Sequence, residues 1–206
     1  MPSSTTPWFR DPTDVPRKRI RRRVRRRGDM TLLEYFDTPE TVLPQELIYG
    51  RMHVADAPSV SHQRIVLRLA IALNDHVEQH QLGEVLVAPV DVVLDRDRGL
   101  VLQPDLLFVS RDHGGQVLDR IYGAPDLVIE VLSPHPRIGR LDERIAWFAE
   151  HGVREIWLYD QPTSRLDILT CDDGKVISRA SVVDGPISSS VLPRFTASLV
   201  SILGYV

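Results

Sequence analysis

Hydrophobic residues along this chain recur at two spacings, one typical of helices and one of strands. The clearest helical pattern covers residues 60–80, where apolar side chains fall on one face: Ile65, Leu69, Ala72 and Leu73. Ser59 or Ser61 is placed to cap the first turn of this helix. Shorter amphipathic patterns predict two further helices, over residues 31–37 and about 139–151.

Short apolar runs rich in β-branched residues predict the strands. Three of them follow the 60–80 helix directly, at residues 84–95, 100–110 and 126–133, and a fourth covers 154–160 after the next helix. Three strands in a row and then a crossover helix predict an α/β fold with a mixed central sheet flanked by helices.

Additional strands are expected on both sides of this central part. Residues 45–56 have the pattern of a tight hairpin around Gly50. Two or three short strands are predicted at the C-terminal end, two of them joined by a turn at Asp172, Asp173 and Gly174, with a last apolar stretch from Leu192 to Leu203.

The cysteine count and the hydropathy exclude some classes of protein. One cysteine, Cys171, excludes an internal disulfide and fits a reducing compartment. No apolar stretch approaches the roughly 20 residues of a membrane span, and the N-terminal sequence lacks the apolar core of a signal peptide. We therefore expect a cytoplasmic protein with no membrane partner, and we leave open that it forms a homodimer.

The net charge of −3 hides a marked asymmetry between two parts of the chain. Residues 1–27 contain ten basic and two acidic residues, a balance of +8, whereas the remainder contains 15 basic and 26 acidic residues, a balance of −11. Nine of the basic residues form one block that we expect to bind nucleic-acid phosphates: Arg17, Lys18, Arg19, Arg21, Arg22, Arg23, Arg25, Arg26 and Arg27.

Composition also sets the expected domain division. Residues 1–29 have no apolar period and are predicted to be a disordered basic arm, and residues 30–206 a single domain. A second interpretation of the arm is equally open. Met30 begins a sequence that suits the start of a domain, so the upstream residues could come from a start codon assigned too early.

Two strands of the predicted central sheet each carry an acid inside an apolar run. Glu130 lies in the middle of DLVIEVLS, and Asp105 follows Pro104 in LVLQPDLLFVS. A carboxylate in such a place must be paired, hydrogen-bonded or bound to a metal, because an isolated buried charge costs several kcal/mol. Either acid alone could simply cap a loop or pair with an arginine.

Together, the two acids favour a metal site. Adjacent strands lie about 4.8 Å apart, so carboxylates at facing positions can share one cation that removes their repulsion. Mg²⁺ prefers oxygen ligands and keeps several waters, and such a site suits phosphodiester hydrolysis. Asp126 shares the strand parity of Glu130, but it opens its strand, so a cap or turn role is expected and Asp126 stays a weaker candidate.

These segments resemble a known family. The order LQPDLLFVS, APDLVIEVLSP and HGVREIWLYD, preceded by ELIYGRMHV and SHQRIVLRLAIAL, is similar to the Uma-type restriction endonucleases of the PD-(D/E)XK nuclease superfamily, over about residues 30–190. The resemblance implies a restriction-endonuclease-like αβββαβ core and DNA cleavage that depends on Mg²⁺ or Mn²⁺. It assigns the metal-binding acids of the two motif halves to Asp105 and Glu130, with Glu46 of the hairpin as an additional candidate.

The chain departs from the family pattern at the lysine of the second motif half. Leu132 occupies its place, and the only lysines are Lys18 and Lys175. In Uma-type proteins a lysine commonly lies on the following helix, where this chain has Arg144. Arg144 could hold the scissile phosphate, but it cannot act as a general base. Its alternatives are a charge on the helix surface or a salt bridge to Glu130.

The remaining candidates and the rival functions follow from these residues. His62 near a helix N-terminus could meet a phosphate, although a surface role in the cap region is the simpler expectation. The leading function is a Mg²⁺-dependent DNA endonuclease. The alternative is a catalytically impaired nucleic-acid-binding or scaffolding protein with a nuclease fold, which the missing lysine and the acidic body favour. A protein–protein interaction domain has only the exposed arm in its favour.

Overall fold

Two of the predicted strands are divided in the middle, and this division determines the architecture. The computed structural model describes residues 29–39, 43–113, 116–133 and 141–204. The stretch predicted at 84–95 forms β3 (Gly83–Val87) and β4 (Val92–Asp95), which lie in different sheets. The stretch at 100–110 likewise forms β5 (Leu100–Leu102) and β6 (Leu106–Ser110). Pro89 and Pro104 lie at the breaks, and a proline has no N–H for a strand ladder.

The sheet with the longer strands has the order β12-β11-β10-β9-β6-β3. Its other strands are β9 (Leu127–Leu132), β10 (Glu155–Asp160), β11 (Arg165–Asp172) and β12 (Lys175–Val182). The β9–β10 pair is parallel and the remaining pairs are antiparallel, so the sheet is mixed. We call it the central sheet.

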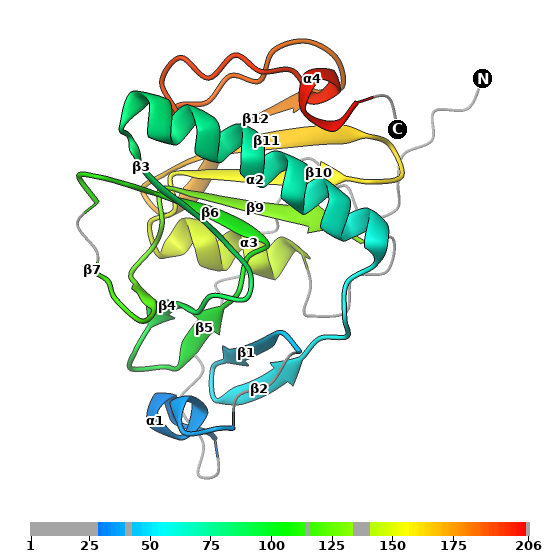
Figure 1. Ribbon diagram of the computed structural model, residues 1–206. Helices are drawn as coiled ribbons and strands as arrows, with labels where there is room; N and C mark the ends of the chain where they lie inside the picture. Colours follow the sequence, from blue (N-terminus) through cyan, green and yellow to red (C-terminus); the bar gives the residue numbers. More distant parts are fainter. Residues whose placement is uncertain (1–28, 40–42, 114–115, 134–140, 205–206) are drawn as a thin grey trace.

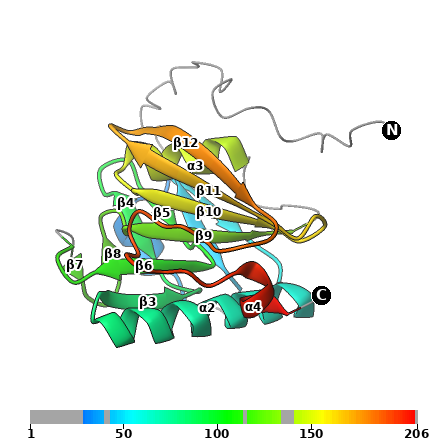
Figure 2. The ribbon, with the colours of Figure 1, turned by 90° about the horizontal axis from the view of Figure 1, so that it is seen from above.

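Helices cover both faces of the central sheet (Figures 1 and 2). On one face, α2 (Val60–His80) and α4 (Leu199–Leu203) pack over the side chains of Phe108, Ile129 and Trp157. On the other face, α3 (Leu141–Glu150) packs with residues of β4 and β5. The order α2-β3-β6-β9-α3-β10 is the predicted αβββαβ core, and the expected α/β, restriction-endonuclease-like fold is confirmed.

A second, smaller sheet lies beside the first, in the order β2-β1-β5-β4-β8-β7. Its remaining strands are β1 (Gln45–Ile48), β2 (Arg51–Val54), β7 (Gln116–Val117) and β8 (Ile121–Tyr122). The predicted hairpin around Gly50 is its β1–β2 edge. Helix α1 (Leu32–Phe36) covers it through Tyr35, which is buried with Leu47, Val93 and Val101.

The helical pattern predicted its element more closely than the last apolar stretch did. Helix α2 has the predicted bounds, and Ser59 is its cap, accepting a hydrogen bond from the N–H of His62. The sequence leaves open whether the stretch Leu192–Leu203 is a third strand, and its end forms α4 with Ser198 as cap. Its apolar residues Leu192, Leu199 and Leu203 are buried in the same core as α2.

Location and assembly stay predictions. Within the described part of the chain, no helix is both long and apolar enough to cross a membrane. The cytoplasmic location, the homodimer and the division into an arm and one domain are not tested by the fold. Residues 1–28 lie outside the described ranges.

One buried acid ties the C-terminal segment to the central sheet. Glu155 of β10 is only 1% exposed. Its carboxylate accepts hydrogen bonds from the indole N–H of Trp157 at 2.7 Å and the hydroxyl of Ser189 at 2.6 Å, and from the N–H and hydroxyl of Ser190 at 2.7 and 2.6 Å. Four donors therefore solvate this charge, and no described basic side chain forms an ion pair with it.

Glu155→Ala should lower the free energy of unfolding by about 3 kcal/mol or more, because each buried donor left without an acceptor costs about 1–3 kcal/mol. Urea unfolding measures the change. The control is Glu84→Ala, which removes an exposed carboxylate from the edge strand β3 and should change stability by less than about 0.5 kcal/mol. Equal effects of the two substitutions would show that the Glu155 hydrogen bonds contribute nothing.

Candidate functional site

The two acids of the apolar strands face each other. Strands β6 and β9 pair antiparallel with Leu106 opposite Ile129 and Leu107 opposite Val128. Continuing this register by one residue places Asp105, just before β6, opposite Glu130. A carboxylate oxygen of Asp105, Oδ2, accepts the N–H of Val131 at 2.7 Å, so the end of β6 and the middle of β9 are in direct contact. The charge of Asp105 also raises the pKa of Glu130, so the two carboxyl groups lie near each other.

Arg144 is the third member of this group. It comes from the first turn of α3 and is only 9% exposed. Its Nε donates to Oε1 of Glu130 at 2.6 Å, and its Nη1 lies 2.7 and 2.8 Å from the two carboxylate oxygens of Glu46. Its Nη2 donates to the carbonyl of Gln103 at 3.3 Å. The expected alternative of a salt bridge to Glu130 is what the structure contains, and a helix-surface charge is wrong.

Glu46 belongs to the group, but as a partner of arginine. It lies on β1 of the smaller sheet and is 1% exposed. Its Oε1 also accepts the main-chain N–H of Gln103 at 2.8 Å. Both of its oxygens are therefore occupied by donors, which leaves this acid poorly placed to bind a metal directly.

His62 also lies at this group. Its Nε2 is 3.1 Å from Oδ2 of Asp105, and its side chain is 12% exposed, so the expected surface role in the cap region is wrong. Burial lowers the pKa of His62. The hydrogen bond to Asp105 and the charges of Asp105 and Glu130 raise it by more than burial lowers it, so the pKa lies above its ordinary value. The strong Asp105 contact therefore favours the imidazolium form.

Burial dominates the protonation of Glu130. It raises the pKa of this carboxyl to about 8, with smaller increases from the charges of Asp105 and Glu46, against a decrease caused by Arg144. Burial lowers the pKa of Arg144, but the charges of Glu130 and Glu46 outweigh this effect and raise the pKa. The guanidinium therefore stays charged. The group thus contains three carboxyl groups and one permanent positive charge.

Two carboxylate oxygens of the group have no hydrogen-bond partner among the described residues. They are Oδ1 of Asp105 and Oε2 of Glu130, since the contacts of these acids use only Oδ2 and Oε1. In the same described ranges, no cluster of three or more His, Cys, Asp or Glu side chains is arranged to hold a metal ion. A cation at this group would therefore have two protein oxygens and complete its shell with water.

Asp126 is not brought to this group. It precedes β9, four residues before Glu130, and lies at the other end of the central sheet. Its buried carboxylate accepts the N–H of Ser110 at 2.8 Å and a guanidinium N–H of Arg154 at 2.9 Å, and it lies 3.4 Å from His113. These contacts lower the pKa of Asp126 despite its burial. The expected structural role near a strand start fits, and its candidacy as a member of the Asp105 and Glu130 site is wrong.

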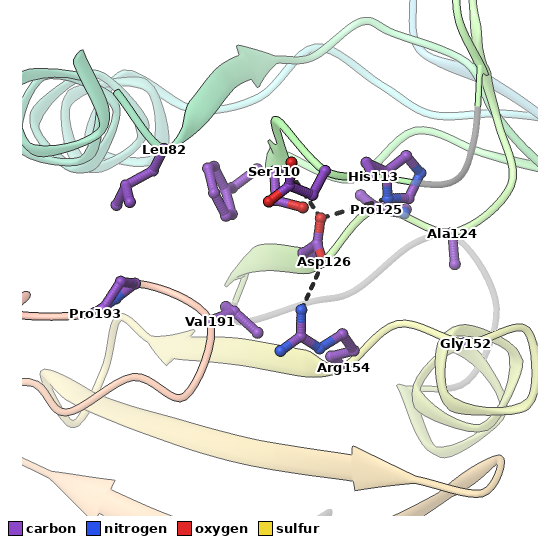
Figure 3. A pocket seen from close by; sticks show the side chains of 12 residues that line it. Leu82, Ser110, His113, Ala124, Pro125, Asp126, Gly152, Arg154, Val191 and Pro193 are labelled. Carbon is purple, nitrogen blue, oxygen red and sulfur yellow. Dashed lines mark hydrogen bonds and ion pairs between the residues drawn. The ribbon is translucent and has the colours of Figure 1, made fainter. Parts of the chain in front are cut away.

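A hollow of the molecule also lies at that far end. This pocket of about 490 Å³ is lined by Asp126, Arg154 and His113 together with apolar residues such as Leu82 and Val191. Figure 3 shows Asp126 between Arg154 and His113. The pocket is therefore separate from the acids Asp105 and Glu130.

Other predicted site residues lie outside the described ranges, and one residue was not predicted at all. The nine basic residues between Arg17 and Arg27 belong to the undescribed part of the chain. The residue that the sequence analysis does not single out is Gln103, which contacts both Glu46 and Arg144. Its only sequence signal is a polar amide inside an apolar run, directly before Pro104 and Asp105.

Comparisons with known proteins agree on the family and the fold. No curated protein matches the sequence. Among solved structures, the chain is similar to the one titled "Crystal structure of a putative nuclease belonging to DUF820 from Anabaena variabilis ATCC 29413", with 20% identity, a TM-score of 0.69, and coverage of 84% of this chain and 97% of that chain. This likeness supports the fold. The family model Uma2, described as "Putative restriction endonuclease", matches residues 32–200. Because that match spans most of the 206 residues, this protein belongs to the Uma2 family.

Proposed function

We propose that this protein is an endonuclease that hydrolyses DNA phosphodiester bonds with the help of Mg²⁺ or Mn²⁺. The family supports nuclease-like function. The observation that carries the proposal is the pair Asp105 and Glu130, opposite each other on neighbouring strands, each with one carboxylate oxygen that no described residue uses.

The charges of the group fit a divalent cation. Asp105, Glu130 and Glu46 bring three carboxyl groups together with the guanidinium of Arg144. Because metal ligands must be deprotonated, a divalent cation would have to displace the proton that burial favours on Glu130. Mg²⁺ prefers carboxylate oxygens and retains several waters, so two free oxygens suffice as protein ligands. When bound there, the cation would make a water molecule more acidic and withdraw charge from the phosphate.

Neighbouring donors hold the second oxygen of each carboxylate and so orient the two free oxygens. The N–H of Val131 and the ring of His62 both hold Oδ2 of Asp105, which leaves Oδ1 for a ligand. Arg144 holds Oε1 of Glu130 in the same way. Because Arg144 has five N–H donors and not all are used, it can also donate to a phosphate oxygen. Its role as the counter-ion of two glutamates is nevertheless the primary one.

The alternative is a catalytically impaired nucleic-acid-binding or scaffolding protein. Two observations favour it. Leu132, at the position of the usual lysine, packs into the apolar core beside α3, and Arg144 forms ion pairs with two acids. No described lysine other than Lys175, at the start of β12, exists to replace it. DNA cleavage assays decide between the two functions.

Asp105→Asn should reduce nicking of supercoiled plasmid in Mg²⁺ or Mn²⁺ by about 100-fold or more, the scale on which loss of one electrostatic contact at a reacting centre reduces the rate. EDTA should abolish the parent's activity. Asp126→Asn is the control, since it alters a buried acid at the other end of the same two strands. Cleavage by Asp105→Asn at the parent's rate would exclude Asp105 from the reaction.

Arg144→Ala should lower the free energy of unfolding by about 3–5 kcal/mol, because it leaves two buried glutamates without their counter-ion. Arg144→Lys retains a positive charge and should be less destabilising, with cleavage equal to or above that of the parent. Thermal unfolding and plasmid nicking are measured in parallel, and Arg51→Ala on the exposed β2 is the stability control.

The comparison of Arg144→Lys with the parent also tests the alternative. A parent that cleaves no form of DNA with either metal, while Arg144→Lys gains cleavage, would identify a nuclease fold disabled at this one position. If the Arg144→Ala variant cleaves DNA as well as the parent, Arg144 has no role in cleavage.

A chain that begins at Met30 should bind DNA more weakly and with a smaller salt dependence, because each phosphate neutralised by a basic side chain adds about 0.9 to the slope of log affinity against log salt. Titrations over a salt series measure this slope. The control keeps the arm's length but replaces its nine clustered basic residues by glutamine, and it should behave like the truncation. Unchanged binding would exclude the arm, and a melting temperature lower by several degrees would show that the arm packs on the domain.

A further inference from the structure

Gln103 lies where the chain passes from the smaller sheet to the central sheet. Strand β5 ends at Leu102 and β6 begins at Leu106, so the residues between them have no strand ladder for their main-chain groups. The N–H of Gln103 donates to Oε1 of Glu46 at 2.8 Å, and its carbonyl accepts from Nη2 of Arg144 at 3.3 Å. The main chain of a single residue thus contacts both members of an ion pair that joins β1 to α3.

The side chain of Gln103 holds this main chain in place. Its Oε1 accepts the N–H of Gln45 at 3.1 Å, and its Nε2 donates to Oδ1 of Asp91 at 2.9 Å. One partner is a donor only and the other is a carboxylate, so the orientation of the amide is set by its partners. Gln103 therefore makes four hydrogen bonds, two through its side chain and two through its main chain.

Asp91 is itself held from two further elements. Its Oδ1 accepts the hydroxyl of Tyr35 from α1 at 3.0 Å, and its Oδ2 accepts Nε of Arg120, just before β8, at 3.2 Å. The Tyr35 hydroxyl also lies 2.9 Å from the carbonyl of Gln45. The amide of Gln103 is thus attached to a hydrogen-bonded group that spans the smaller sheet and α1.

We propose that Gln103, held by Asp91, is the positioning residue that aligns Arg144, Glu46 and the Asp105 segment with one another. This inference rests on the proposed function, since it assigns Gln103 a role in the same site. Pro104 has a fixed φ angle, so the placement of Gln103 is carried directly to Asp105. Groups that orient metal ligands in this way commonly change metal affinity or activity by about 10–100-fold when they are altered.

The test exchanges the donor and acceptor of the Gln103–Asp91 contact. Gln103→Glu places two carboxylates against each other, and Asp91→Asn places two amides there. The double variant restores the bond in reverse. The amide introduced at position 91 can donate both to the carboxylate introduced at position 103 and to the Tyr35 oxygen, while its carbonyl accepts from Arg120. The control is the same pair of changes at exposed positions of α2, Gln79→Glu and Asp75→Asn.

Two measurements are made on the full chain. The first is the exchange rate of the Nε–H proton of Arg144 with water, followed by NMR without metal, with the Nε–H of Arg98 beside Asp95 as internal reference. The second is the dissociation constant of Mn²⁺ by calorimetry. Each single variant should accelerate the Arg144 exchange and weaken Mn²⁺ binding by about tenfold or more. The double variant should return both to within about threefold of the parent, and Arg98 and the α2 control should not change.

The outcomes separate this inference from the proposed function. Absence of Mn²⁺ binding in the parent would overturn the proposed function, and the Arg144 exchange rate would still decide the role of Gln103. Single variants with parental exchange and Mn²⁺ affinity would overturn the positioning role, even with a lowered melting temperature. A double variant as impaired as the single ones would overturn it as well. If Gln103→Glu does not fold, Tyr35→Phe and Asp91→Asn perturb the same group more mildly and are read in the same way.

Discussion

The buried bridge from Glu46 through Arg144 to Glu130 is the interaction on which the arrangement of the molecule depends. It joins β1 of the smaller sheet, α3 and β9 of the central sheet through contacts of 2.6 to 2.8 Å. Breaking such a bridge leaves uncompensated charge in a buried place. The two sheets and the helix are therefore held in one relative position at the place where the candidate ligands lie.

The same bridge determines which acids stay available. Glu46 uses both oxygens for Arg144 and Gln103, whereas Asp105 and Glu130 each use one. Three acids at one place would repel one another strongly if they were all free. The internal guanidinium of Arg144 reduces this repulsion through its ion pairs with Glu46 and Glu130. The contacts of Arg144 thus make it first of all the counter-ion of two glutamates.

The breaks at Pro89 and Pro104 explain why charged and polar side chains lie together at this point. A continuous strand would bury its acid within a ladder, but the break after β5 releases three residues whose main-chain groups need other partners. Glu46, Arg144 and the Ala88 N–H supply them. The side chain of Asp105 is then free to turn toward β9, where it contacts Val131.

Local pattern was enough to predict the helix 60–80, the hairpin, the αβββαβ order and the pair Asp105 and Glu130, because periodicity and strand parity depend only on near neighbours in the chain. It also favoured a cap or turn role for Asp126, because Asp126 opens its strand, but it could not exclude this residue from the site. It also could not place His62 or Glu46 beside these acids. Those decisions depend on which end of the sheet each residue reaches and on contacts between segments far apart in the chain, such as Arg144 with Glu46 and His62 with Asp105. Only the tertiary structure brings such segments together, because packing of the two sheets, and not local propensity, sets their distance.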